Sequence, residues 1–223
     1  MRHTLTAQVL ARAIKNLYPK SKLAIGPTID DGFYYDVESE KSISSDDLSK
    51  IEDEMKKIIK TKSSITKKLV SKSEALKVFK ENKESYKEII VNESKQKDNF
   101  QLYYQDDKKF VDLCRGPHLP NLEFIGSFKL TKVSGAYWKG DSANAMLTRI
   151  YGTAFNNEKD LQSHLDNLEE ALKRDHRKLG KEMDLFHFQD EAPGMVFWHQ
   201  NGWSIYRKLR NFIRGRLKEN DYI

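Results

Sequence analysis

The stretch that decides the fold spans residues 23–37 and reads Leu-Ala-Ile-Gly-Pro-Thr-Ile-Asp-Asp-Gly-Phe-Tyr-Tyr-Asp-Val. Two apolar runs are separated by turn-forming residues, and Asp-Asp-Gly is typical of a tight turn. The stretch therefore predicts two strands joined by a glycine turn. Tyr34 and Tyr35 are neighbours in the second strand, so one of them must face inward and the other outward.

Helical patterns and further strands lie on both sides of this hairpin. Apolar side chains recur at helical spacing over residues 5–18, and Pro19 ends that helix. After the hairpin, Ser44 to Asp47 offer N-caps for a helix to about Thr61, and a short helical stretch opens at Ser73. Residues 64–70, 100–113 and 123–132 are β-rich. The predicted fold class is α+β, an antiparallel sheet with packed helices.

The organisation changes after residue 155. A long helix begins at Asn156 and has an apolar stripe that is typical of ordinary packing: Leu161, Leu165, Leu168 and Leu172. The basic segment 174–180 follows, and an aromatic stretch then leads to an amphipathic helix over 202–219. We predict three parts: a domain over 1–155, a linker helix and boundary over 156–180, and a truncated start of a further domain over 181–223.

Composition limits the class of protein. Hydrophobic residues make up 38% and charged residues 32% of the chain, which favours a folded protein. No apolar run reaches the roughly 20 residues of a membrane-spanning helix, and the single cysteine is compatible with a reducing compartment, so we expect a cytoplasmic protein without a membrane partner. The net charge of +6 suits a polyanionic partner, although any one basic run can equally be a solvated helix face.

Reactive side chains gather in the segment Asp112-Leu113-Cys114-Arg115-Gly116-Pro117-His118. An acid, a thiol and an imidazole lie within seven residues at a Gly-Pro turn. Cys-x-x-x-His is also half of a possible zinc site, but tetrahedral zinc needs three or four ligands and the chain has no second cysteine. A buried cysteine beside a hydrogen-bonded histidine is the structural alternative.

Four motifs carry a family resemblance. They are residues 25–36, residues 112–118, Gly135-Ala136-Tyr137-Trp138-Lys139-Gly140-Asp141-Ser142, and residues 146–155. Together they resemble the editing domain of threonyl-tRNA synthetases, the second additional domain type that alanyl-tRNA synthetases share. The resemblance continues through residues 174–180 and 191–199, which are similar to the opening of that family's class II catalytic core.

The resemblance implies a hydrolase site for mischarged seryl-tRNA(Thr). In the family, two histidines of a His-x-x-x-His helix join the cysteine and histidine of the Cys-x-x-x-His motif. Here that first motif is broken: an alignment on Arg2-His3 places Ala7 at the second histidine, whereas an alignment on Val9-Leu10-Ala11 places Thr4 and Gln8 at the two positions. Gln8 can form hydrogen bonds but cannot act as a base near neutral pH.

The implied site residues follow from these positions. The candidate catalytic residues are Cys114, His118, Asp112, Lys87, His3 and Gln8. The candidate substrate-binding residues are Tyr34 and Gly116. Because too few imidazoles remain, we expect no metal in this domain.

The resemblance further implies that the parent enzyme ligates threonine to tRNA(Thr) as a homodimer. It would use ATP, magnesium and a catalytic zinc, bound by residues beyond Ile223. The chain by itself is therefore not expected to charge tRNA. Two alternatives stay open: a free-standing hydrolase that edits in trans, and a catalytically impaired tRNA-binding module.

Overall fold

Helix α1 (Arg2–Leu17) is the element around which the first compact unit is built. The computed structural model describes residues 1–106 and 110–222, and this unit spans Met1–Gln162. Every residue of α1 from Leu5 to Ile14 is buried, so neighbours cover the helix on all sides. The predicted helix is confirmed, and its polar residues Gln8 and Arg12 are buried together with the apolar ones.

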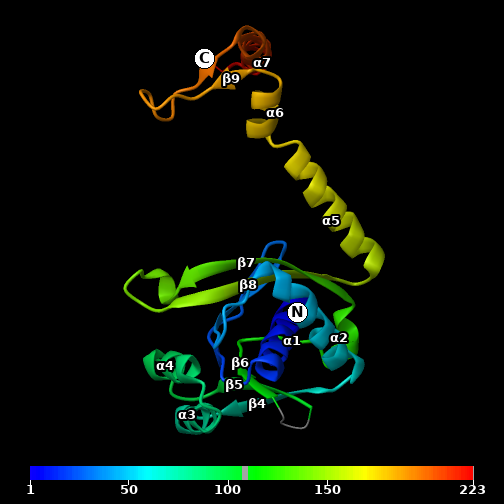
Figure 1. Ribbon diagram of the computed structural model, residues 1–223, viewed down its shortest axis with the longest axis vertical. Coiled ribbons are helices and arrows are strands. Elements are labelled where there is room, and N and C mark those ends of the chain that lie inside the picture. The colour runs from blue at the N-terminus through cyan, green and yellow to red at the C-terminus, as the bar shows by residue number, and fades with distance from the viewer. Residues whose placement is uncertain (107–109, 223) are drawn as a thin grey trace. The chain divides into compact units, whose positions relative to one another are not determined.

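One antiparallel sheet covers α1 (Figure 1). It contains β1 (Lys22–Leu23), β2 (Thr28–Ile29), β3 (Gly32–Glu38), β7 (Ser127–Tyr137) and β8 (Met146–Phe155), in the order β1-β3-β8-β7 with β2 also paired to β3. The predicted hairpin is present as β2 and β3, but its first strand is split at Gly26 and Pro27. Pro27 interrupts the strand because proline has no N–H to donate to the neighbouring strand. Gly26 is glycine because a Cβ at this position would come within 2.2 Å of the Tyr35 ring.

A second antiparallel sheet contains β4 (Ile65–Val70), β5 (Phe100–Gln105) and β6 (Phe110–Leu113). Residues 107–109, inside the predicted β-rich segment 100–113, lie outside the described residues. Helices α3 (Lys72–Glu81) and α4 (Ser85–Glu93) pack on one face, where Phe100 and Leu102 join Phe79. The other face carries Tyr103, Gln105 and Asp112. Helix α4 was not predicted from the sequence.

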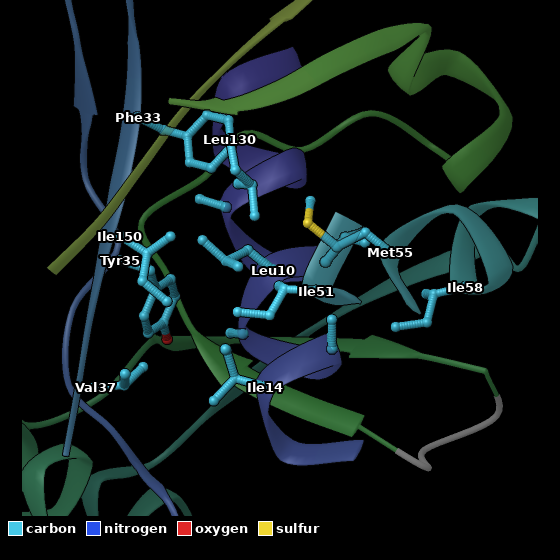
Figure 2. Packing of buried hydrophobic residues seen from close by; sticks show 14 of the residues in the cluster. Leu10, Ile14, Phe33, Tyr35, Val37, Ile51, Met55, Ile58, Leu130 and Ile150 are labelled. Atoms are coloured by element: carbon cyan, nitrogen blue, oxygen red, sulfur yellow. The ribbon is translucent and has the colours of Figure 1, made fainter. Parts of the chain in front are cut away.

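The main core lies between α1, the larger sheet and helix α2 (Leu48–Lys60). In Figure 2, Leu10 and Ile14 of α1 lie between side chains of β3 and side chains of α2 such as Ile51 and Met55. Short 3₁₀ turns at Ser45–Asp47, Leu122–Ile125 and Trp138–Gly140 connect the elements. The predicted capping segment is confirmed, because Ser44 and Asp47 form a capping box.

The second compact unit spans Ser163–Ile223. It contains most of α5 (Glu158–Lys173), then α6 (His176–Glu182), the strand pair β9 (Phe186–His187) and β10 (Phe197–Trp198), and α7 (Gln200–Glu219). In α5, Leu168 and Leu172 are 44% and 72% exposed, so the prediction that the leucine stripe is ordinary packing is wrong for these two side chains. The domain limits at residues 155 and 180 stay predictions. No helix among the described residues is both long and apolar enough to cross a membrane.

Candidate functional site

Three buried polar side chains from three elements meet in the first unit. Lys87 Nζ lies 2.5 Å from Asp112 Oδ1 and donates a hydrogen bond of 3.0 Å to the Tyr35 hydroxyl. The Tyr35 hydroxyl in turn donates to Asp112 Oδ2 at 2.8 Å. Lys87, Asp112 and Tyr35 are only 2%, 4% and 1% exposed. The opposite charges compensate each other, which is the condition for burying either of them.

The strand alternation of β3 explains why Tyr35, and not Tyr34, belongs to this triad. Tyr35 faces the core with Phe33 and Val37, whereas Tyr34 lies on the opposite face of the strand. There the Tyr34 ring lies 3.9 Å from the Arg149 guanidinium. Burial and Asp112 raise the pKa of Tyr35 well above its ordinary value, so its hydroxyl remains a donor at neutral pH.

The segment from Cys114 to His118 follows β6 directly. Gly116 has a φ of +60°, and a Cβ at this position would come within 1.9 Å of the Tyr103 hydroxyl oxygen. Glycine is therefore required both by the backbone conformation and by the space. The Gly116 N–H donates to Cys114 Sγ at 3.3 Å. Burial raises the pKa of the Cys114 thiol above its ordinary value, so the thiol is protonated at neutral pH.

The imidazole of His118 packs on the ring of Tyr103, with 4.1 Å between the ring centroids. Neither of its buried nitrogens has a hydrogen-bond partner among the described residues. Burial lowers the pKa of His118 to about 4, although the charge of Asp112 opposes this shift. His118 is consequently neutral at physiological pH, with one ring nitrogen able to accept a proton.

A pocket of about 600 Å³ lies beside these groups and is lined by Lys87, Cys114 and Gly116 among others. Such a volume accommodates a ligand of nucleoside size. Its lining comes from α1, the segment before β2, α4, the loop before β5, and the end of β6. The lining residues include Thr4, Lys87, Gln101, Cys114, Arg115 and Gly116.

The two candidates on α1 lie in different places. Gln8 is buried and donates to the carbonyl oxygen of Tyr103 at 3.2 Å, beside the ring that supports His118. His3 instead donates to the carbonyl oxygen of Ala154 at 3.0 Å and borders a neighbouring hollow, which shares Thr4 and Thr28 with the Cys114 pocket. The α1 residue that lines the Cys114 pocket is Thr4. The structure thus brings together Cys114, Lys87 and Gly116 at one pocket. Asp112, Gln8 and the ring nitrogens of His118 are buried near these residues but do not line the pocket, and Tyr34 lies on the opposite face of β3.

Metal binding was assessed from the side chains present. The described part of the chain has no group of three or more His, Cys, Asp or Glu side chains placed to hold a metal ion. Tetrahedral zinc would need such a group. The expected absence of a metal from this domain stays a prediction.

Comparisons with known proteins identify the family of the chain. The family model of the threonyl and alanyl tRNA synthetase second additional domain matches residues 101–151. A threonine–tRNA ligase of Prochlorococcus marinus (strain MIT 9211) is 51% identical over 222 residues, which cover 100% of this chain and 34% of that ligase. The chain belongs to the threonyl-tRNA synthetase family. It spans about a third of the length of the curated relative that it matches.

The threonyl-tRNA synthetase family model covers only some of the residues of the site. Residues 101–151 include Tyr103, Asp112, Cys114 and His118, whereas the other members of the site come from α1, β3 and α4, outside the matched range. The predicted fold class is confirmed as α+β with antiparallel sheets and the second additional domain. The assignment of residues 181–223 to the opening of a class II core stays a prediction.

Sequence reasoning missed two residues that the structure places at this site, Tyr35 and Thr4. Tyr35 could have been found from strand alternation together with the neighbouring Phe33 and Val37, which mark the inward face. Thr4 could have been found from the alignment that places it four residues before Gln8, because these positions share one face of a helix. The sequence alone does not show which alignment is correct, and so it does not show whether Thr4 or His3 occupies the position of the first histidine.

Proposed function

We propose that the first unit of this chain is an editing hydrolase that cleaves the ester of seryl-tRNA(Thr). The observation that supports this proposal best is the pocket of about 600 Å³ that Cys114, Lys87 and Gly116 line together. Family membership makes an aminoacyl-tRNA the expected partner, and the net charge of +6 suits it.

The reaction needs a water molecule that attacks the ester carbonyl and a group that receives its proton. His118 lies four residues after Cys114 but outside the lining of the pocket, and both of its ring nitrogens are buried. We expect its imidazole, which its pKa of about 4 keeps unprotonated at pH 7, to hold or deprotonate this water once the substrate is bound. The same low pKa makes it a weak base, so we expect positioning of the water to contribute more than proton abstraction. The protonated Cys114 thiol lines the pocket as a hydrogen-bonding group and does not attack the ester.

Lys87 is placed to stabilise the negative charge that develops on the carbonyl oxygen. An ammonium group has three N–H donors. Two of them are used by Asp112 and Tyr35, and the side chain also lines the pocket. The third donor is therefore left for a group inside the pocket. A fixed donor of this kind contributes about 2.7 to 4 kcal/mol to lowering the barrier of an ester hydrolysis.

An enzyme that attaches threonine to tRNA needs a separate hydrolytic site in order to reject serine. Serine lacks only one methyl group of threonine, and a single group of this size provides about 1 to 3 kcal/mol of discrimination in a binding pocket. Hydrolysis of the wrong ester at a second site adds the missing accuracy. ATP-dependent threonylation of tRNA(Thr), with its magnesium and zinc, remains a prediction for the longer relatives.

One observation favours a second candidate function, a catalytically impaired tRNA-binding module. Neither Thr4 nor Gln8 can act as a base, and the one nearby histidine on α1, His3, is bonded to Ala154 and does not line the pocket. A domain that keeps its pocket while losing two imidazoles would still bind the end of a tRNA.

Serine-charged tRNA(Thr) separates the two functions. The chain is incubated with it, and loss of the ester is followed beside Cys114→Ala and His118→Ala. Ester loss above the buffer rate that both variants reduce at least about 10-fold supports the hydrolase. Binding at the same affinity in all three proteins, with ester loss at the buffer rate, supports the impaired module. His187→Ala in the second unit is the matched histidine control, and it is expected to hydrolyse like the wild type.

A further inference from the structure

Tyr103 lies at the centre of the site but belongs to none of the groups assigned above. It is in β5, and the strand register places it directly opposite Asp112 of β6. Residues that face each other in antiparallel strands project to the same side of a sheet, so the two side chains are neighbours. Tyr103 is 4% exposed, and its burial raises the pKa of its hydroxyl above the ordinary value.

The ring of Tyr103 supports His118. The two ring centroids are 4.1 Å apart and the ring planes are inclined by 47°. Because the imidazole has no hydrogen bond to another described side chain or to the backbone, this contact is the main one that orients it.

The hydroxyl of Tyr103 supports the loop that carries Cys114. It lies where a side chain at Gly116 would have to be, and it donates to Gln101 Oε1 at 3.3 Å. Gln101 lines the pocket, and its carbonyl oxygen accepts a hydrogen bond from the Cys114 N–H at 3.2 Å. One hydroxyl group therefore contacts both Gly116 and the residue to which Cys114 is anchored.

The backbone of Tyr103 anchors helix α1. Its carbonyl oxygen accepts the hydrogen bond of 3.2 Å from Gln8, across 95 residues of sequence. Ring, hydroxyl and backbone of one residue thus contact His118, Gly116 and Gln8, which come from two different segments of the chain.

We propose that Tyr103 is a positioning residue for ester hydrolysis, which acts through His118 by packing against its ring and through Cys114 by holding the loop at Gly116. The inference rests on the proposed hydrolase function of this site. Tyr103 itself does not line the pocket, so it need not contact the substrate.

The packing also explains why His118 is neutral. The groups that act on the imidazole are the carboxylate of Asp112, which favours the protonated form, and the amino terminus at α1, which opposes it. Burial, which lowers the pKa as the amino terminus does, outweighs the effect of Asp112, and the ring of Tyr103 is part of what buries His118. Removal of this ring exposes the imidazole and is expected to raise its pKa toward the ordinary value of 6.5.

Two variants of Tyr103 and two matched variants of Tyr104 test the proposal. Tyr104 is the next residue along β5, but it packs on the opposite face with the α3 and α4 cluster. Tyr103→Phe keeps the ring and removes the hydroxyl, whereas Tyr103→Leu removes both. Each is compared with Tyr104→Phe or Tyr104→Leu for kcat on the seryl ester, for the pKa of His118 by NMR, and for the alkylation rate of Cys114.

We expect Tyr103→Leu to raise the pKa of His118 by at least about one unit and to lower kcat at least about 10-fold, with a smaller change in KM. Tyr103→Phe is expected to leave that pKa near 4 and to increase the alkylation rate of Cys114 severalfold. An unchanged His118 pKa in Tyr103→Leu, or an unchanged alkylation rate in Tyr103→Phe, overturns the proposal. Equal effects of the Tyr104 variants overturn it as well. Absence of hydrolysis in the wild type refutes the proposed function instead, since the NMR and alkylation readouts do not depend on activity.

Discussion

Lys87 Nζ and Asp112 Oδ1 are 2.5 Å apart, and their side chains are 3% and 5% exposed. The pair is almost completely removed from water, and the hydroxyl of Tyr35 bonds to both partners. Such a pair is held by mutual compensation, so the loss of one charge leaves the other buried and unpaired.

Lys87→Met is therefore expected to reduce the free energy of unfolding by about 3 to 5 kcal/mol. The measurement is urea unfolding at pH 7. Lys62→Met provides the matched control, because the Lys62–Glu123 pair has a similar distance of 2.8 Å but side chains that are 64% and 52% exposed. This control should cost less than about 1 kcal/mol. Equal losses of unfolding free energy in the two variants would show that burial of the Lys87–Asp112 pair does not increase the effect of removing one charge.

The two neighbouring tyrosines of β3 offer a second matched pair. Tyr35→Phe removes a hydroxyl that donates to Asp112 and accepts from Lys87, and it is expected to cost about 1 to 3 kcal/mol of stability. Tyr34→Phe removes a hydroxyl from the other face of the strand and should stay within about 0.5 kcal/mol of the wild type. We also expect hydrolysis to fall only in Tyr35→Phe. A larger effect of Tyr34→Phe on either quantity contradicts the assignment.

The low pKa of His118 predicts how stability depends on pH. The unfolded imidazole binds a proton near pH 6.5 and the folded one near pH 4, so the unfolded state holds more protons between these values. The contribution of His118 to the free energy of unfolding is therefore complete above pH 6.5 and is lost as the pH falls to 4. The loss is at most about 3.5 kcal/mol, at about 1.4 kcal/mol for each unit of pKa shift.

The difference in unfolding free energy between the wild type and His118→Gln isolates this contribution. It should shrink as the pH is lowered from 7 to 4, because glutamine does not titrate. A difference that stays constant over this range would mean that His118 titrates normally in the folded protein. Hydrolysis should also stay nearly constant from pH 6 to pH 8, since the imidazole is already neutral there.

Thr4 and Gln8 allow a gain-of-function prediction. Thr4 lines the Cys114 pocket and Gln8 lies one turn later on α1, so histidines at both positions would face the site. The double variant Thr4→His with Gln8→His is expected to raise the rate of seryl ester hydrolysis by about 10-fold or more, since acid-base groups contribute on this scale. His3→Ala should leave the rate unchanged. A double variant that folds and is no faster would show that these positions do not reach the ester.

The sequence was sufficient for some parts of this picture and insufficient for others. Helical periodicity predicted α1, and turn chemistry predicted the hairpin of β2 and β3, because both signals are local. The motif around Cys114 placed the thiol and the imidazole near each other for the same reason. By contrast, the meeting of Lys87 with Tyr35 and Asp112 depends on three elements that are distant in the chain, and no local pattern encodes it.

The errors have equally specific causes. Tyr34 was preferred to Tyr35 because adjacent tyrosines carry no mark of which one faces inward until the sheet is assembled. His3 was included for its chemistry, whereas its position on α1 directs it toward Ala154. The leucines of α5 were expected to be buried because periodicity predicts an apolar face but not the presence of a partner for it.

The rate of ester loss from tRNA(Thr) charged with serine or with threonine tests whether the pocket beside Cys114 hydrolyses a mischarged ester. With enzyme in excess over tRNA, we expect the seryl ester to disappear at least about 10-fold faster than in buffer, and the threonyl ester to disappear more slowly than the seryl ester. Loss of the seryl ester at the buffer rate, with the tRNA bound, would contradict the account.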